Sequence, residues 1–148
     1  MPQLELNELT KRFENDSIIA VDDLSLTVQD GEFLVIVGPS GCGKSTTLDC
    51  IAGLETPTSG DIVVDGESKN GIRPQDRNVA MVFQNYSLYP HMTVRDNLGF
   101  GLKMSSSKTS NEVASDVESV ADLLQIGELL DQTPDELSGG QKQRVALG

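Results

Sequence analysis

Residues 38–45 read GPSGCGKS, a pattern of glycines, one lysine and one hydroxyl that is suited to binding phosphate. The spacing matches G-x-x-x-x-G-K-[ST], in which a glycine-rich loop turns several backbone N–H groups toward one point without side-chain clashes. A helix that begins directly after the loop adds the positive end of its dipole. We therefore predict that Lys44 reaches the β- and γ-phosphates of a nucleotide and that Ser45 gives its hydroxyl to Mg²⁺.

A glycine-rich turn that matches this pattern by accident is the alternative interpretation. The mechanism of the motif requires a strand before the loop and a helix after it. The run FLVIV at 33–37 precedes the loop, and its continuous hydrophobicity is typical of a strand buried on both faces, as in a parallel sheet. A helical pattern begins at about Lys44, with Leu48, Ile51 and Ala52 on one side. This context favours nucleotide binding.

The elements around the loop change in type along the chain. Further strands are predicted at about residues 4–9, 17–28, 59–66 and 78–83. Thr93 and Asp96 are spaced as a capping box that opens a short helix through Leu98. The polar run at 105–110 predicts a loop, and a last helix is expected near Ser138. The chain is therefore β-rich to about residue 83 and helix-rich after about residue 93.

A second amphipathic helix is predicted beyond the polar run. Thr109 and Glu112 are spaced as a capping box at its start. Apolar residues then recur at helical spacing and predict one buried stripe, which consists of Val113, Val117, Val120 and Leu124.

Composition limits the possible partners. The 148 residues fit one domain of ordinary size, and 23 acidic against 11 basic residues give a net charge of −12. This balance argues against a nucleic-acid partner, whose phosphates need Lys and Arg. It fits either a highly soluble surface or adaptation to high intracellular salt, where charge repulsion is screened.

Cysteine usage and the apolar runs bear on the compartment. Cys42 and Cys50 are expected to be unpaired thiols, as suits a reducing cytosol. The first residues lack the apolar core of a signal peptide, and the five-residue run at 33–37 is too short to cross a membrane. His91, the only histidine, is expected to be solvated.

A second motif separates the families that share the phosphate loop. The guanine-reading segment Asn-Lys-x-Asp of GTPases is not present. LSGGQ at 137–141 resembles the signature of ATP-binding-cassette (ABC) ATPases, and MVFQNYSLYPHMTVRDNL at 81–98 resembles their Q-loop. The order of the motifs also matches, so the resemblance covers essentially the whole chain. GPSGCGKSTTLDCIAGLETPTSGDI, YPHMTVRDNLGFGL and LSGGQKQRVALG look most like the ATPase subunits of carbohydrate and related solute importers.

The resemblance implies an α/β fold: a P-loop NTPase with an incomplete RecA-like core, an N-terminal antiparallel β subdomain and a helical subdomain. The β-rich ATP-binding part spans about 1–83, the Q-loop about 84–92, and the helical subdomain with the signature about 93–148. In the family, later strands complete the sheet around the phosphate-loop strand. We therefore expect residues 33–37 to have unpaired neighbours and exposed apolar surface, and the 148-residue chain to fold incompletely or aggregate.

The resemblance also assigns site residues. Phe13 stands where the family places an aromatic ring that stacks on adenine, although a Phe packed into the strand edge is the alternative. Gln84 would act in catalysis by contacting the attacking water and, with Ser45, would hold Mg²⁺; the alternative is a polar strand end. Residues 86–91 would lie near the surface that touches the membrane subunit. The residues that would wrap the phosphates of ATP, with Lys44 also catalytic, are Gly38, Ser40, Gly41, Cys42, Gly43, Lys44, Ser45 and Thr46.

The signature residues imply a second subunit. In the family, residues matching Ser138, Gly139, Gly140 and Gln141 close on the γ-phosphate of an ATP held by the partner in a head-to-tail dimer. A helix cap alone is the alternative role. The other implied partners are transmembrane permease subunits and, indirectly, an extracytoplasmic solute-binding protein. The resemblance thus implies a cytoplasmic protein that is peripheral on the inner face of the cell membrane, with ATP and Mg²⁺ as cofactors.

Hydrolysis also needs an acidic residue for Mg²⁺ and a water-positioning group. In the family these groups follow the signature, in the Walker B strand, the D-loop and a switch histidine, and this sequence ends at Gly148 before them. We therefore expect the N-terminal part of an importer ATPase, inactive alone, whose complete form couples ATP hydrolysis to import of a sugar or related solute. The alternatives are a naturally truncated, non-catalytic nucleotide-binding protein and a soluble ABC ATPase that acts on ribosomes or DNA.

Overall fold

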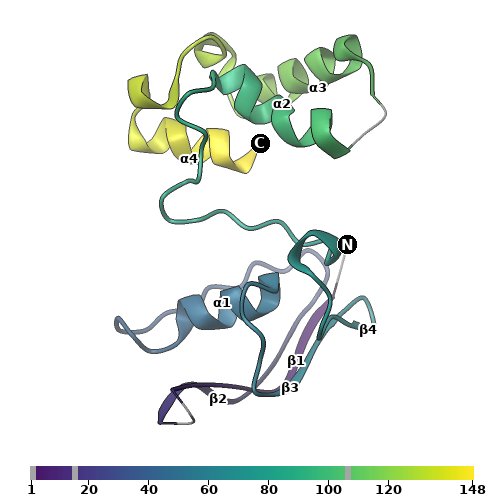
Figure 1. Ribbon diagram of the computed structural model, residues 1–148, viewed down its shortest axis with the longest axis vertical. Helices are drawn as coiled ribbons and strands as arrows, with labels where there is room; N and C mark the ends of the chain where they lie inside the picture. The colour runs from purple at the N-terminus through teal and green to yellow at the C-terminus, as the bar shows by residue number, and fades with distance from the viewer. Residues whose placement is uncertain (1–2, 15–16, 106–107) are drawn as a thin grey trace. The chain divides into compact units, whose positions relative to one another are not determined.

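The chain divides into two compact units in the computed structural model, which describes residues 3–14, 17–105 and 108–148. We call Met1–Met81 the sheet unit and Val82–Gly148 the helical unit. Figure 1 shows that the strands and α1 belong to the first unit and that α2, α3 and α4 belong to the second.

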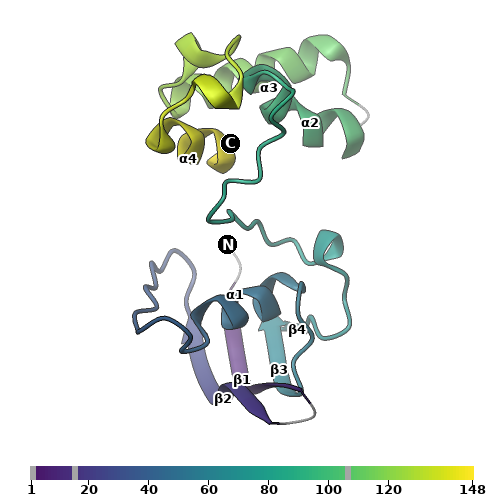
Figure 2. The same ribbon diagram turned by 60° about the vertical axis from the view of Figure 1, so that its left-hand side comes forward.

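An antiparallel sheet with the strand order β2-β1-β3-β4 forms the base of the sheet unit (Figure 2). The strands are β1 (Leu4–Phe13), β2 (Ile18–Val28), β3 (Ser59–Val64) and β4 (Glu67–Ser68). The predictions of strands at 4–9, 17–28 and 59–66 are therefore confirmed. Apolar side chains alternate along β1 and β3, and one face of the sheet is consequently available for packing.

The core of the sheet unit lies between this face and helix α1 (Lys44–Ala52). Its buried members are Leu6, Leu9, Val21, Cys50 and Ile62. The helix predicted from about Lys44 is confirmed, and its buried residues are Thr47, Cys50 and Ala52, while Leu48 is 47% exposed. Leu48 and Ile51 instead border a hollow of about 670 Å³ that residues 33–36 also line.

Arg77 anchors the end of α1. Its side chain is 3% exposed, and its Nη1 donates hydrogen bonds to the carbonyl oxygens of Cys50 (2.8 Å) and Ile51 (3.0 Å). Its Nε donates to the carbonyl of Ile72 at 2.9 Å. Gly53, with φ of 82°, ends the helix, and a Cβ atom there would collide with the guanidinium. Burial lowers the pKa of Arg77, so this cation depends on the carbonyl groups that surround it.

Two predicted strands are not formed. Residues 33–37 and 78–83 are irregular, because a strand requires a neighbour for its hydrogen bonds and the described residues place none beside either segment. The expected exposure of the first segment is confirmed, since its five apolar side chains are between 37% and 90% exposed. Continuous hydrophobicity therefore identified a segment suited to burial but not the presence of a partner.

Three helices surround the core of the helical unit. They are α2 (Val94–Ser105), α3 (Ser110–Leu123) and α4 (Gly139–Leu147), and they are joined by short turns that include η2 (Gly127–Leu129) and η3 (Pro134–Glu136). The core comprises Val94, Leu98, Val113, Val117, Ala121, Ile126, Leu129, Leu130, Leu137 and Val145. The predicted stripe of α3 is confirmed: Val113 and Val117 are buried, and Val120 and Leu124 pack against them.

The predicted end of α2 was wrong, because the helix continues past Leu98 to Ser105. At Gly99 the helix lies against α3: a Cβ atom at this position would be in van der Waals contact with Val113 and Val117 at 3.4 and 3.5 Å. The predicted polar loop at 105–110 includes residues 106 and 107, which lie outside the described residues.

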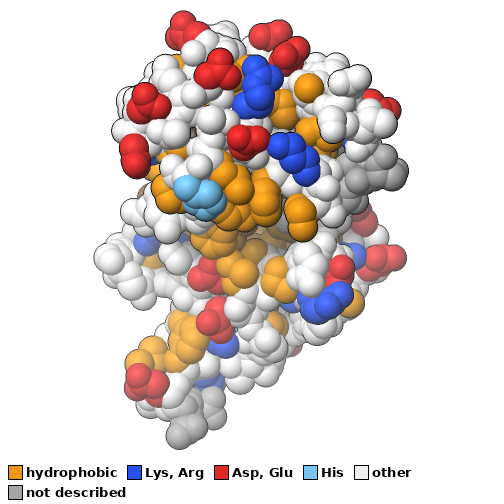
Figure 3. All heavy atoms as spheres, turned by 45° about the horizontal axis from the view of Figure 1, so that its top comes forward, with side chains coloured by type: hydrophobic (Ala, Val, Ile, Leu, Met, Phe, Trp, Pro, Cys, Tyr) orange, Lys and Arg blue, Asp and Glu red, His pale blue; other side chains and the backbone are white. Residues whose placement is uncertain are grey.

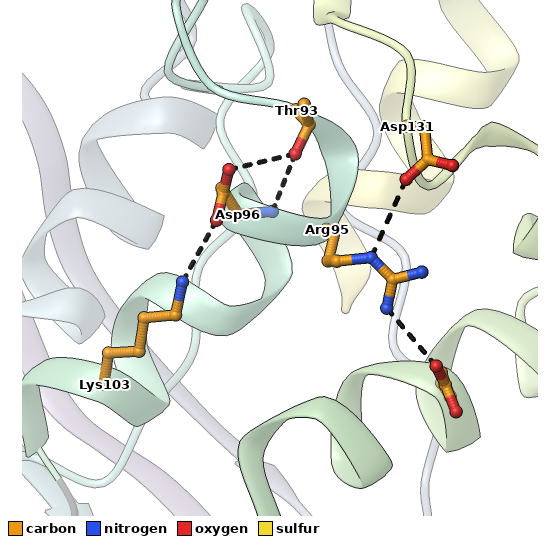
Figure 4. A network of polar contacts seen from close by, with 6 residues as sticks. Thr93, Arg95, Asp96, Lys103 and Asp131 are labelled. Carbon is orange, nitrogen blue, oxygen red and sulfur yellow. Dashed lines mark hydrogen bonds and ion pairs between the residues drawn. The ribbon is translucent and has the colours of Figure 1, made fainter. Parts of the chain in front are cut away.

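Polar contacts fix the start of α2 (Figure 4). The Thr93 hydroxyl accepts a hydrogen bond from the Asp96 amide at 3.2 Å, which confirms the predicted cap, and Lys103 bonds the Asp96 carboxylate at 3.0 Å. On the other side, Arg95 lies 3.4 Å from the Glu118 carboxylate of α3 and 3.8 Å from that of Asp131. Arg95 therefore ties α2 to two other segments of the helical unit.

Carboxylates at the caps make the helical unit sensitive to acid. Hydrogen bonds from Lys103 and then Thr93 lower the pKa of Asp96, and hydrogen bonds from Thr109 lower that of Glu112 in the predicted and confirmed capping box. Each folded-state pKa lies below its unfolded value, so the stabilisation is present above the ordinary carboxyl range and is lost as pH falls through the folded-state values.

We therefore expect helix content, measured by circular dichroism at 222 nm, to fall as pH is lowered from about 5 to about 2. The matched control is Glu112→Gln, since glutamine also serves in a capping box but does not titrate. The acid transition of this variant should be shallower. An identical transition in both proteins would contradict the role of Glu112.

Candidate nucleotide-binding site

The phosphate loop, residues 38–45, joins the irregular segment 33–37 to α1. Gly41 and Gly43 have φ of 82° and 88°, a region that favours glycine, and the Cys42 amide donates to the Pro39 carbonyl across the turn at 3.4 Å. A Cβ atom on Gly38 would lie 2.6 Å from the Cys42 sulfur. The path of the backbone thus requires glycine at Gly41 and Gly43, whereas at Gly38 a Cβ would displace the Cys42 side chain.

Lys44 folds back over its own loop. Its Nζ donates hydrogen bonds to the carbonyl oxygens of Gly38 (2.9 Å) and Pro39 (2.6 Å) and lies 3.5 Å from the Cys42 sulfur. Ser45, the second residue of α1, is exposed. The loop therefore gathers an ammonium group, a hydroxyl and a helix start, which are groups that suit the oxygens of a phosphate.

A bulge in β2 packs against the phosphate loop. Lys11 pairs with Val21 and Arg12 with Ile19, so the register skips Ala20. The Ala20 carbonyl approaches Gly43 so closely that a Cβ atom there would collide with it. On the other side of Gly43, its carbonyl accepts hydrogen bonds from the Thr47 amide (2.8 Å) and hydroxyl (2.9 Å). The loop is thus held between the sheet and α1.

Phe13 lies at the end of β1 and is half-buried. It pairs with Ile18, which is two residues from the bulge at Ala20 and therefore about 7 Å from it along the strand. The sheet thus brings the predicted base-stacking ring and the phosphate loop to the same region. A hollow of about 400 Å³, lined by β2 residues and by Cys42, Gly43 and Lys44, lies beside the loop.

The signature residues form the start of α4. Ser138 is its N-cap, and the Ser138 amide donates to the Gln141 side chain at 2.7 Å while the Ser138 hydroxyl accepts from the Gln141 amide at 3.4 Å. The helix near Ser138 is therefore confirmed, with a complete capping box. The Tyr86 hydroxyl lies 3.5 Å from the position of a Cβ on Gly139, so the Q-loop turn and the signature are neighbours.

Other predicted residues lie on the surface of the helical unit. Gln84 and His91 are exposed, and Tyr86 and Ser87 have φ of 63° and 49°. His91 contacts Tyr89 edge-on at 6.2 Å, and Figure 3 shows the pale-blue histidine bordered by hydrophobic side chains. In the part of the chain that the structure describes, no helix combines the length and apolar character needed to span a membrane.

Both cysteines are free thiols, as predicted. Cys42 is exposed in the phosphate loop, whereas Cys50 is buried in α1. Burial raises the pKa of the Cys50 thiol, so this thiol stays protonated and inert while the sheet unit is folded.

The structure groups the predicted residues into two sets. Phe13 and residues 38–46 lie in the sheet unit, while Gln84 and residues 138–141 lie in the helical unit. Sequence reasoning missed Lys11 and Ala20. Lys11 could have been found, because residues two apart in a strand share a face and Lys11 is two before Phe13. No local signal marks the bulge at Ala20.

The chain thus carries the glycine-rich motif at 38–45 in the sheet unit and the LSGGQ motif at 137–141 in the helical unit. Residues 21–148 match the sequence profile of the family described as ABC transporter, and the chain belongs to this family.

Similar proteins agree with the importer resemblance. The whole chain is 62% identical to the xylose/arabinose import ATP-binding protein XacJ of Haloferax volcanii, and it covers 38% of that protein. It is 56% identical to the sn-glycerol-3-phosphate import ATP-binding protein UgpC of Bartonella bacilliformis, covering 42% of that protein. It is 50% identical to the trehalose import ATP-binding protein SugC of Mycobacterium tuberculosis, covering 37%. The chain thus spans about two fifths of the length of these relatives.

A solved structure confirms the fold class. The ATP-binding cassette MJ0796, in a dimeric post-hydrolysis state bound to ADP and Pi, matches 97% of this chain with a TM-score of 0.84 and 30% identity, and 67% of that chain is covered. The prediction of a P-loop NTPase with an antiparallel β subdomain and a helical subdomain is therefore confirmed.

Proposed function

We propose that this chain binds MgATP and forms part of the ATPase subunit of an importer for a sugar or a related solute. The observation that carries the proposal is the phosphate loop, which Ala20 and Thr47 hold in the conformation that its glycines require. The names of the relatives support the importer class, since they are import ATP-binding proteins for xylose/arabinose, sn-glycerol-3-phosphate and trehalose.

The residues of the sheet unit suit this ligand. Lys44 would exchange the two carbonyl groups that it now bonds for phosphate oxygens, and the loop amides and the start of α1 would donate to the same oxygens. Ser45 would hold Mg²⁺, which neutralises charge on the phosphates. The base would stack on Phe13. The phosphate-wrapping set is the one given above, from Gly38 to Thr46.

The helical unit would contribute to a second nucleotide site. Residues 138–141 would face the γ-phosphate of an ATP bound by another subunit, because a helix start stabilises an anion presented from outside the chain. Gln84 would contact Mg²⁺ and the attacking water during hydrolysis. Transmembrane permease subunits would carry the solute, and the ATPase would then lie on the inner face of the membrane. ATP binding and hydrolysis by the whole protein would drive that transport.

The direct test measures binding of MgATP by calorimetry to the whole ATPase subunit of which we propose this chain is a part, together with two glycine variants. Gly43→Ala adds both strain and a collision with Ala20, whereas the matched Gly41→Ala adds only strain, because a Cβ there has open space. We expect a loss of about tenfold in affinity for Gly41→Ala, corresponding to about 1–2 kcal/mol of strain, and a larger loss for Gly43→Ala. Absence of ATP binding by the unmodified subunit would refute the proposal.

A further inference from the structure

Lys11 lies against the ring that we propose to stack on the base. Lys11 and Phe13 are two residues apart on β1 and therefore share one face of the strand. The Lys11 Nζ is 4.7 Å from the centroid of the Phe13 ring, within the range of a cation–π contact. The ammonium thus covers one face of the ring, and any further stacking must use the opposite face.

The ammonium is itself fixed by the segment that follows α1. Its Nζ lies 2.8 Å from the Glu55 carboxylate and donates to the Thr56 carbonyl at 2.8 Å, and the Lys11 side chain is only 12% exposed. Hydrogen bonds from the Thr58 amide to the Thr10 carbonyl (2.8 Å) and from the Arg12 amide to the Thr58 hydroxyl (2.9 Å) join the same segment to β1. Lys11 is therefore a rigid support rather than a mobile surface charge.

We propose that Lys11 is a positioning residue for the aromatic base of a nucleoside triphosphate. It holds Phe13 in one orientation, so the ring is ordered before the ligand arrives and less conformational entropy is lost on binding. It also connects Phe13 to the segment that follows α1, while the phosphate loop leads into the start of α1. Both ends of the ligand would therefore be positioned relative to the same helix. This inference rests on the proposed function, because it assumes that a nucleotide occupies the phosphate loop.

The test compares two probes, MgATP and inorganic tripolyphosphate with Mg²⁺, which share the phosphate chain but differ in the base. Lys11→Met keeps the length of the side chain and removes its charge. We expect the affinity for ATP to fall about three- to tenfold in this variant, in line with the strength of a cation–π contact and lost ordering, and that for tripolyphosphate to stay unchanged. Lys11→Arg should restore ATP binding, because guanidinium also stacks on aromatic rings.

Lys69→Met is the matched control. Lys69 lies in the same unit, is 14% exposed and pairs with Glu67 at 2.9 Å, but it does not touch Phe13. It should leave both affinities unchanged. In a Phe13→Ala background, Lys11→Met should have no further effect on ATP binding.

The outcomes separate the two proposals. Equal weakening of both probes by Lys11→Met would show a purely structural role and overturn the inference, and so would unchanged ATP binding. Protection of Cys50 from thiol reagents checks that each variant is folded. If the unmodified chain bound neither probe, the proposed function would fail first and the inference with it. If the unmodified protein bound tripolyphosphate as tightly as ATP, only the proposed role of Lys11 and Phe13 in binding the base would be overturned.

Discussion

Replacing Arg77 with methionine is expected to lower the free energy of unfolding of the sheet unit by about 3–5 kcal/mol. Methionine fills much of the same space, but it removes the guanidinium donors of three carbonyl groups. The Cys50 carbonyl keeps the Gly53 amide at 3.1 Å, whereas the carbonyls of Ile51 and Ile72 lose the donor that now bonds them. Each unpaired buried acceptor costs about 1–3 kcal/mol. The variant no longer has to bury a cation on folding, and this gain offsets part of the loss.

Cys50 provides the measurement, because it is buried beside Arg77 and reacts only when the sheet unit opens. Its labelling rate across a denaturant series gives the free energy of opening, and Cys42→Ser removes the exposed thiol from the background. Arg73→Met is the matched control: Arg73 is exposed and forms one ion pair, with Asp76 at 3.0 Å, so its loss should change stability by no more than about 0.5 kcal/mol. Equal effects of the two arginine variants would contradict the anchoring role.

Lys44→Ala is expected to weaken binding of MgATP about 100-fold, or about 2.7 kcal/mol. The ammonium is the only side-chain cation that lies against the phosphate loop among the described residues, and a charge-assisted contact to phosphate is worth more than a neutral one. The variant also loses two hydrogen bonds that close the unliganded loop. Isothermal titration with MgATP measures the change.

Two further variants isolate the role of Lys44. Lys44→Arg retains a cation but not its compact shape, so it should recover only part of the affinity. Lys103→Ala removes an equal charge from the helical unit, where Lys103 bonds Asp96, and should leave the affinity unchanged. An affinity for ATP that is insensitive to Lys44→Ala would place the nucleotide elsewhere on the chain.

The fold was predictable where the determining signals are local. The start of α3 at Ser110 followed from the capping pattern of Thr109 and Glu112, since the bonds involved join residues three apart. The strands at 33–37 and 78–83 were predicted wrongly because strand formation depends on a neighbour that hydrophobicity does not reveal. The end of α2 was also predicted wrongly, since the helix continues past Leu98 to Ser105.

The residues of the candidate site were likewise predictable only where the determining signal is local. Residues 38–45 were identified from the sequence because backbone geometry alone demands glycine at several of their positions. The residues that support the loop and its helix were not identified from the sequence. Ala20 contacts Gly43 through its main-chain carbonyl, and Arg77 bonds the end of α1 from 27 residues away in sequence. A contact made by a main-chain carbonyl does not depend on the type of residue, so the sequence does not reveal it. A buried arginine cannot be distinguished from an exposed one in the sequence, because its burial depends on partners that are distant along the chain.

The first turns of the helices differ in a way that follows function. Asp96 lies in the first turn of α2 and Glu112 in that of α3, whereas α1 and α4 carry no acidic residue there. The capping box of α4 uses the neutral Gln141 at the position where α3 uses Glu112, although the hydrogen-bonding pattern is the same. In a chain with a net charge of −12, the two helices that begin at the phosphate loop and at the signature therefore have no carboxylate in the first turn, where it would interact most strongly with the positive end of the helix dipole. In α3, the Glu112 carboxylate interacts with the positive end of the helix dipole. In α4, the neutral Gln141 does not, so the positive end of this dipole stays available to an anion from outside the helix.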